Sequence, residues 1–274
     1  MNFKNIPWKK RFFQACWLLM GIGAIVLFGA SILRKQAKPC TDIQVDIAGA
    51  EQHMFLDEKD ILNLINKQQT IVGAATSKTN LRFLEHALGT NSWVDQAELY
   101  FDNNQVLKVH IQEREPVARV FLIGGGSFYV DSTGLRLPLS EKLSAKVPVF
   151  TNFPSNRPVL AKPDSSLLNG VVQMAMTILA DSFWTAQVQQ INIDQQQQFE
   201  LVPLIGHHLI LMGTAENLEN KFKRLSAFYE QALVQHGLNK YGKLDLRFNN
   251  QVVASLQDSI KINNKQTDKP LTVK

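Results

Sequence analysis

One unbroken apolar stretch stands near the amino terminus, at residues 12–33. It carries no charged side chain, and Gln14 is its one strongly polar residue. A helix of this length rises roughly 33 Å, which is enough to cross a bilayer core of about 30 Å. Lysine and arginine flank the stretch on both sides, with a small excess before it, and this favours a cytoplasmic amino terminus. We therefore predict a cytoplasmic head at 1–11 and a single transmembrane helix at 12–33. A cleaved secretory signal and a buried helix of a soluble domain are the alternatives.

After this stretch the apolar residues change from a continuous run to an alternating pattern. In 42–48 every second residue is apolar, as in a half-buried strand. The elements predicted in this part, in chain order, are the strand at 42–48, helices that begin at Asp57 and at Thr79 or Asn80, and strands at 94–101 and 106–113. Two helices on one face of a three-stranded sheet form a compact α+β domain of order βααββ, which we place at 34–115.

Residues 116–256 contain many short strand patterns and few helical ones. The predicted strands are 117–122, 128–131, 135–137, 188–194, 199–202, 209–212, 243–248 and 251–256. Helical spacing follows a cap at Asp164, and a cap at Thr214 begins what we predict to be the longest helix after the apolar stretch. This is typical of a mixed, mainly antiparallel β domain with flanking helices, so the predicted fold class is α+β. Residues 257–274 are polar and are expected to form a disordered tail.

The formal net charge of +5 includes the basic residues beside the apolar stretch. Membrane insertion and lipid headgroups explain those charges, and no later cluster of basic and aromatic residues indicates a nucleic-acid partner. Cys16 lies within the stretch and Cys40 just beyond it, so an internal disulfide is not expected. Cys40 is therefore either a free thiol or paired between chains.

No motif in the chain predicts catalysis. His207 and His208 are adjacent, so their side chains point apart, and we interpret them as part of a solvated turn. The glycines at 124–126 precede no helix, although a phosphate cradle requires one. Asp131 is interpreted as a turn residue that binds its own backbone. We expect no enzymatic activity, no metal, no cofactor and no small-molecule substrate.

The last predicted hairpin is the candidate functional site. Residues 252–254 are apolar and β-prone, and only the polar tail follows them. An unpaired apolar edge strand invites another strand unless it is covered, so a partner's strand could complete the sheet here. The alternatives are that these residues form an interior strand, or that the tail masks the edge.

Three segments resemble the FtsQ/DivIB family of bacterial cell-division proteins. They are 109–118 (VHIQEREPVA), which looks like that family's junction between two exported domains, 128–134 (FYVDSTG), which looks like its next hairpin, and 244–248 (LDLRF), which looks like its penultimate strand. The resemblance covers nearly the whole chain. It implies a POTRA domain followed by the family's β domain, in a single-pass protein of the bacterial cytoplasmic membrane. The exported domains would lie in the periplasm at the division septum.

The resemblance also implies a function and partners. It implies a non-enzymatic scaffold that binds FtsB and FtsL-like division proteins and acts indirectly on the septal peptidoglycan synthase. In relatives FtsB adds a strand to the last β strand, and by position that surface here is Phe248, Asn250, Val252, Val253, Ala254, Ser255 and Leu256. Val253→Pro is then expected to abolish capture of FtsB because proline lacks the amide donor. Arg247 could reach a partner carboxylate or form an intramolecular pair.

Two other functions stay open from the residues alone. One is a membrane-anchored envelope adaptor or chaperone, which would more often carry tandem POTRA repeats or a barrel. The other is a cell-wall hydrolase, which would need convergent carboxylates or a metal site, and the predicted strands place neither.

Overall fold

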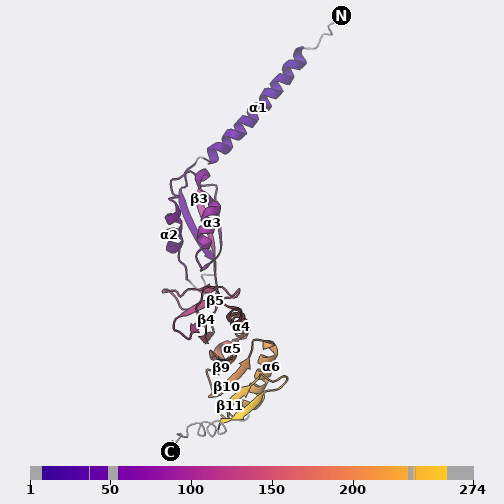
Figure 1. Cartoon of the computed structure of the whole chain (residues 1–274). Helices are drawn as coiled ribbons and strands as arrows, with labels where there is room; N and C mark the ends of the chain where they lie inside the picture. The colour runs from indigo at the N-terminus through magenta and orange to yellow at the C-terminus, as the bar shows by residue number, and fades with distance from the viewer. Residues whose placement is uncertain (1–7, 37, 49–54, 234–236, 238, 258–274) are drawn as a thin grey trace, which may run out of the picture. The chain divides into compact units, whose positions relative to one another are not determined.

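The computed structural model describes residues 8–36, 38–48, 55–233, 237 and 239–257 of the 274-residue chain. The chain forms two compact units, and each is described by itself (Figure 1). The described residues of the first unit run to Glu113 without Phe55, and the second unit comprises Phe55 and the residues from Arg114 onward. The predicted disordered tail lies outside the described residues except for Gln257.

Helix α1 (Trp8–Gln36) contains the apolar stretch (Figure 1). Its described side chains, among them Phe12, Trp17 and Leu27, are largely exposed. Within the part of the chain that the structure describes, no helix has the combination of length and apolar character needed to cross a membrane.

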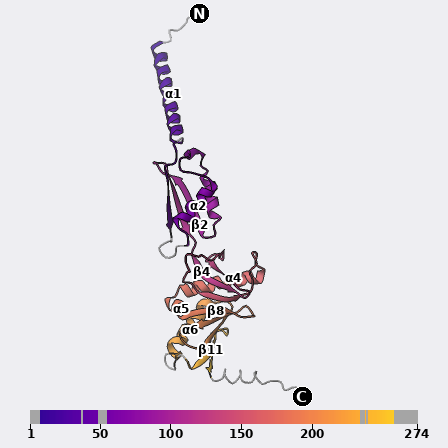
Figure 2. The ribbon, with the colours of Figure 1, turned by 90° about the vertical axis from the view of Figure 1, so that its left-hand side faces the viewer.

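The first unit also holds a three-stranded sheet with two helices. Its elements are β1 (Asp42–Ala48), α2 (Glu58–Gln68), the 3₁₀ turn η1 (Thr76–Lys78), α3 (Leu81–Gly89), β2 (Val94–Phe101) and β3 (Val106–Glu113). The strand order is β1-β3-β2, with β1 parallel and β2 antiparallel to β3. Helix α2 contacts β1 and α3 contacts β2. Figure 2 shows α2 and β2 of this unit in a view turned by 90° from Figure 1. The predicted order βααββ is confirmed.

Local capping explains where the two helices of this unit begin. Asp57 accepts the N–H of Asp60 at 2.8 Å, and the Asp60 carboxylate accepts the N–H of Asp57 at 3.0 Å. This capping box satisfies two backbone donors that would otherwise lack partners at the start of α2. Asn80 caps α3 in the same way by accepting the N–H of Phe83 at 3.1 Å. Cys40 is a buried free thiol.

The second unit is built on a nine-stranded mixed sheet. Its strands are β4 (Pro116–Leu122), β5 (Ser127–Asp131), β6 (Arg136–Leu137), β7 (Val149–Phe153), β8 (Val188–Ile193), β9 (Phe199–Pro203), β10 (Leu209–Gly213), β11 (Tyr241–Asp245) and β12 (Val253–Leu256). The strand order is β12-β11-β10-β9-β8-β7-β4-β5-β6. Three neighbouring pairs, β4–β7, β7–β8 and β10–β11, are parallel and the others are antiparallel. The predicted mixed, mainly antiparallel sheet is therefore confirmed.

Helices α4 (Lys162–Leu179), α5 (Ser182–Gln187) and α6 (Leu218–Phe228) contribute to one core with this sheet. Trp184 of α5 and Phe222 of α6 pack edge to face, with ring centroids 5.4 Å apart. Gly170 lets α4 approach β9 closely, because an added Cβ would lie 3.1 Å from the ring of Phe199. The short helix α5 was not predicted from the sequence.

Two predicted helix starts are wrong. Helix α4 begins at Lys162 after Ala161, so Asp164 lies inside its first turn and is not the cap. Helix α6 begins only at Leu218, because Asn217 before it has a left-handed backbone (φ +52°) that a right-handed helix cannot include. The backbone carbonyl of Thr214 accepts a hydrogen bond from the Lys221 ammonium at 2.8 Å. Helix α6 is also shorter than α4, and it continues into a π-helical turn at Tyr229–Leu233.

The prediction that His207 and His208 form a solvated turn is wrong for His208. His207 is exposed, but His208 is 2% exposed, and its Nε2 lies 2.7 Å from the Tyr229 hydroxyl. Burial raises the pKa of Tyr229 to about 12, against a smaller lowering by a hydrogen bond with Gln187. The π-helical turn that carries Tyr229 closes over this part of the core, and sequence spacing did not reveal it.

Candidate functional site

The candidate site is β12, the strand that ends the nine-stranded sheet. Within the described residues it pairs with one neighbour, β11, in the antiparallel direction. Val253 stands opposite Asp245, Ala254 opposite Leu244, and Ser255 opposite Lys243. Among the strands that the structure describes, none pairs with the other side of β12, which is therefore a sheet edge there.

The direction of the backbone groups along β12 follows from the bonds of β11. Leu246, just after β11, donates its N–H to the carbonyl of Leu211 in β10 at 2.9 Å. Backbone groups of successive strand residues point to opposite sides, so Leu244 also faces β10 while Asp245 faces β12. Asp245 is therefore hydrogen-bonded to Val253, and the N–H and C=O of Ala254 point away from the sheet. A 3.1 Å bond from the N–H of Gln257 to the carbonyl of Lys240 agrees with this alternation.

This register changes which substitution tests the edge. The N–H of Val253 faces β11, so Val253→Pro would remove a bond inside the molecule's own sheet. The donor that a partner strand could use at this point of β12 is the N–H of Ala254.

Three large apolar side chains of the predicted surface are exposed. Phe248 is 49% exposed, Val253 is 41% exposed and Leu256 is 47% exposed. Val252 and Ala254, on the alternate positions, pack against the core. Ser255 is half-buried, and Asn250 is exposed in the loop before β12, where its φ of +60° is a conformation that asparagine tolerates. The predicted residues thus form one continuous segment. Val253 and Leu256 lie three positions apart and so point to opposite faces of the strand, and each exposes apolar surface.

An arginine of α6, which sequence reasoning missed, holds the loop that leads into this strand. Arg224 donates to the carbonyls of Phe248 at 2.7 Å and Leu246 at 3.2 Å, and also to the carbonyl of Gln251. Hydrogen bonds from a charged donor are stronger than neutral ones, and three of them converge here. The position of Phe248 therefore depends on a residue 24 positions earlier in the chain.

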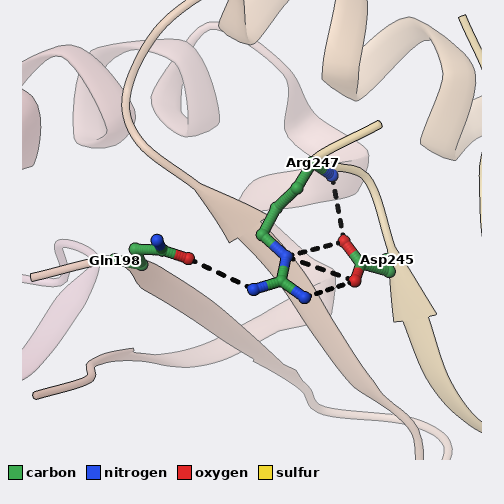
Figure 3. Close-up of polar contacts among 3 residues, drawn as sticks. All are labelled: Gln198, Asp245 and Arg247. Atoms are coloured by element: carbon green, nitrogen blue, oxygen red, sulfur yellow. Dashed lines mark hydrogen bonds and ion pairs between the residues drawn. The ribbon is translucent and has the colours of Figure 1, made fainter. Parts of the chain in front are cut away.

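Arg247 forms an intramolecular pair with Asp245, which decides between the two alternatives left by the sequence (Figure 3). Its Nη2 lies 2.6 Å from Oδ2 of Asp245, its Nε lies 2.9 Å from Oδ1, and its Nη1 donates to Gln198 at 3.4 Å. Burial by itself would raise the pKa of Asp245, but the hydrogen bonds from Arg247 outweigh it and the pKa is lowered. The same hydrogen bonds raise the pKa of Arg247.

Gly213 is needed where β10 meets Arg247. Its φ is +71°, and a Cβ at this position would lie 2.9 Å from Cγ of Arg247. A glycine here therefore permits both the backbone turn and the close approach of the arginine stem. Beside it lies a polar cavity of about 220 Å³, lined in part by Lys221, Arg224 and Asn250.

The described residues contain no group of three or more histidine, cysteine, aspartate or glutamate side chains placed to hold a metal ion. What the site offers is a row of backbone donors and acceptors beside exposed apolar side chains. Such an arrangement can bind an extended polypeptide.

Comparisons with known proteins agree with the two units. Residues 115–255, slightly more than half of the chain, match the family model described as FtsQ/DivIB, C-terminal related, and residues 38–112 match a POTRA-like domain. The cell division protein FtsQ of Rhodothermus marinus is 25% identical over 242 residues, which cover 86% of this chain and 84% of that protein. The FtsQ proteins of Salinibacter ruber and Geotalea daltonii are 26% and 23% identical. These matches cover 59% and 72% of this chain, and 64% and 70% of those proteins.

Proposed function

The chain belongs to the FtsQ/DivIB family, and from that premise we propose that it is a non-enzymatic scaffold of the bacterial division complex. In this proposal it captures FtsB by strand addition at β12, and FtsL joins the same assembly. It thereby links early and late division proteins and helps to control septal peptidoglycan synthesis.

One observation carries the proposal. Strand β12 is a sheet edge within the described residues, and Phe248, Val253 and Leu256 expose apolar surface beside it. Backbone bonds to the edge would supply affinity in any strand addition, whereas side-chain contacts select the partner. The exposed apolar side chains are suited to that selection because they are desolvated when a partner covers them.

The proposal includes attachment to the cytoplasmic membrane through residues 12–33, with the amino terminus in the cytoplasm and both folded units in the periplasm at the septum. Its support is the absence of charged residues in this stretch and the exposure of its described apolar side chains. An exposed run of this kind in water would promote association, so a lipid environment is the favoured surrounding.

Ala254→Pro tests capture at the edge. Proline removes the outward N–H and places its ring where a partner strand would approach, and it is tolerated on a strand whose N–H faces away from the sheet. The full-length Ala254→Pro variant in detergent should bind purified FtsB of the same organism at least about tenfold more weakly than the unchanged protein does. A tenfold loss of affinity corresponds to about 1.4 kcal/mol of binding free energy. The thermal midpoint of the variant should stay close to that of the unchanged protein.

Val253→Pro is the matched control, because its N–H is bonded to β11. It should lower the thermal midpoint, since it breaks a bond inside the sheet. Leu256→Glu, at an exposed side chain, should weaken binding without unfolding. If Ala254→Pro and Leu256→Glu both fold and both bind FtsB as the unchanged protein does, β12 is not the capture site.

A further inference from the structure

Arg119 lies on the surface of the second unit, on strand β4 and far along the sheet from β12. It stands opposite Tyr129 of β5 in the strand register. Its neighbours Ala118 and Val120 are fully buried in the core, so the Arg119 side chain projects from the opposite face of the sheet. Six strand spacings of about 4.8 Å separate β4 from β12, or roughly 29 Å, so this surface is distinct from the proposed FtsB edge.

Two aromatic rings hold the guanidinium in place. Its Cζ lies 4.9 Å from the ring centroid of Phe121 and 5.6 Å from that of Tyr129, both within the range of cation–π attraction. Tyr129 is itself fixed, because its hydroxyl lies 3.1 Å from Oγ of Ser144 and accepts the N–H of Ala145 at 3.1 Å. The guanidinium is therefore held in position without an acidic partner among the described residues.

The hydrogen bonds of Arg119 are weak for an arginine. Its terminal nitrogens lie 3.3 Å from Oγ of Ser144 and 3.4 Å from Oγ of Ser127, and its buried Nε has no hydrogen-bond partner among the described residues. By contrast, Arg114 and Arg247 each pair with an aspartate, at 2.8 Å and 2.6 Å. No ion pair involves Arg119 within the part of the chain that the structure describes. A partly buried cation with weak hydrogen bonds and no ion pair among the described residues favours binding of an anion.

The space for that anion is a hollow of about 240 Å³ beside the guanidinium. Besides Arg119 and Tyr129 it is lined by Leu139, Ser140, Glu141, Lys142, Leu143 and Ser144. Arg119 and Lys142 are cations and Glu141 is a carboxylate, so the lining carries one net positive charge. This charge suits a singly charged anion better than a doubly charged phosphate. The exposed side chain of Leu139 offers apolar contact for the stem of an acidic side chain.

We propose that the Arg119 hollow binds a carboxylate, namely an acidic side chain of a polypeptide partner that docks on the β4–β5 face. The planar guanidinium matches the two carboxylate oxygens, and the serine hydroxyls complete the hydrogen bonds. This contact is separate from strand addition at β12 and would bring a second binding surface to the same unit.

The experiment follows the Nε–H signal of Arg119 by NMR, with ¹⁵N-arginine in the full chain in detergent micelles. The signal is assigned through its absence from the Arg119→Lys variant. N-acetyl-glutamate amide is the probe, and N-acetyl-glutamine amide at equal ionic strength is the neutral control. The expected result is a saturable shift with the glutamate probe and none with the glutamine probe. A shift of equal size with chloride, or no saturable shift, overturns the proposal.

Two further ligands test whether the bound anion is a carboxylate, free phosphate or a lipid headgroup. Inorganic phosphate and micelles doped with phosphatidylglycerol should shift the signal less than the glutamate probe at equal concentration. A larger shift with either one overturns the assignment to a carboxylate on a polypeptide.

Variants then separate recognition from folding, with probe binding followed through the backbone amide of Ser144. Arg119→Lys should weaken binding of the glutamate probe about fivefold or more. Lysine keeps the positive charge but lacks the planar guanidinium that can bind both carboxylate oxygens. Arg136→Lys is the matched control, since Arg136 also lies over a ring, that of Phe128, but is already bonded to two backbone carbonyls. It should leave binding unchanged. Glu141→Gln should tighten binding about twofold by removing a competing charge. Unchanged binding in Arg119→Lys with an unchanged thermal midpoint contradicts the proposal.

Discussion

At the scale of single residues, two aspartates of the second unit each bind a nearby backbone N–H and an arginine side chain. Asp131 accepts the N–H groups of Thr133 and Leu135, both at 2.9 Å, as expected of a turn residue. It also pairs with Arg114 at 2.8 Å, which the turn pattern did not predict. Asp245 likewise accepts the N–H of Arg247 and binds its guanidinium. The Asp245–Arg247 pair joins residues two positions apart, whereas the fold decides the pairing of Asp131 with Arg114, 17 positions earlier.

Asp245→Asn tests the ion pair at this scale. The carboxylate has a lowered pKa in the folded protein, so it contributes stability above its unfolded pKa, and that contribution is lost as pH falls through the folded pKa. The variant should therefore be less stable than the unchanged protein at pH 7, by about 0.5–1.5 kcal/mol, because the Arg247 side chain is 44% exposed and solvent screens the pair. The difference should shrink below about pH 4, where the carboxylate of the unfolded chain takes up its proton. Urea unfolding at pH 7, 4 and 3 measures this, and a difference that does not change with pH would count against the pair.

At the scale of elements, the regular strands followed from the sequence and several helix ends did not. The bounds predicted for β1, β2 and β3 agree with the structure, because alternation is strong there and one face of the sheet is buried. Helix α5 has six residues, too few for helical spacing to be visible. Helix α6 starts after Asn217, whose left-handed backbone (φ +52°) was not visible in the capping pattern at Thr214.

Helix α6 also governs the candidate site, and Arg224→Lys tests this. Lysine cannot reach three carbonyls from one fixed planar group, so the loop at 246–252 should loosen. Amide exchange in that loop should become faster, and capture of FtsB should weaken about threefold to tenfold, since an ordered loop costs less to bind. Lys223→Gln, an exposed position on the same helix, is the control and should change neither measurement. Unchanged exchange rates in Arg224→Lys would show that the arginine does not hold the loop.

At the scale of the whole molecule, the proposal depends on residues 12–33 lying in a bilayer. One positive charge at the centre of a membrane helix costs about 3 kcal/mol on insertion scales. A double variant, Leu19→Arg with Ile22→Arg, should move the protein out of the carbonate-resistant membrane fraction of cells. The matched variant Leu19→Ile with Ile22→Leu should stay in it. If carbonate extracts the unchanged protein from the membrane fraction, the proposed membrane attachment through residues 12–33 is wrong.

The sequence alone was enough to predict the α+β class, the βααββ order of the first unit, a mainly antiparallel second sheet and an apolar last hairpin. These features depend on side-chain periodicity, which is a property of the chain read in order. Only the tertiary structure decided which backbone groups of β12 point outward, that Arg224 holds the loop before it, and that Arg119 has no acidic partner among the described residues. The reason is physical. The direction of a strand's hydrogen bonds and the neutralisation of a charge depend on neighbours that are distant in sequence, and no local pattern specifies them.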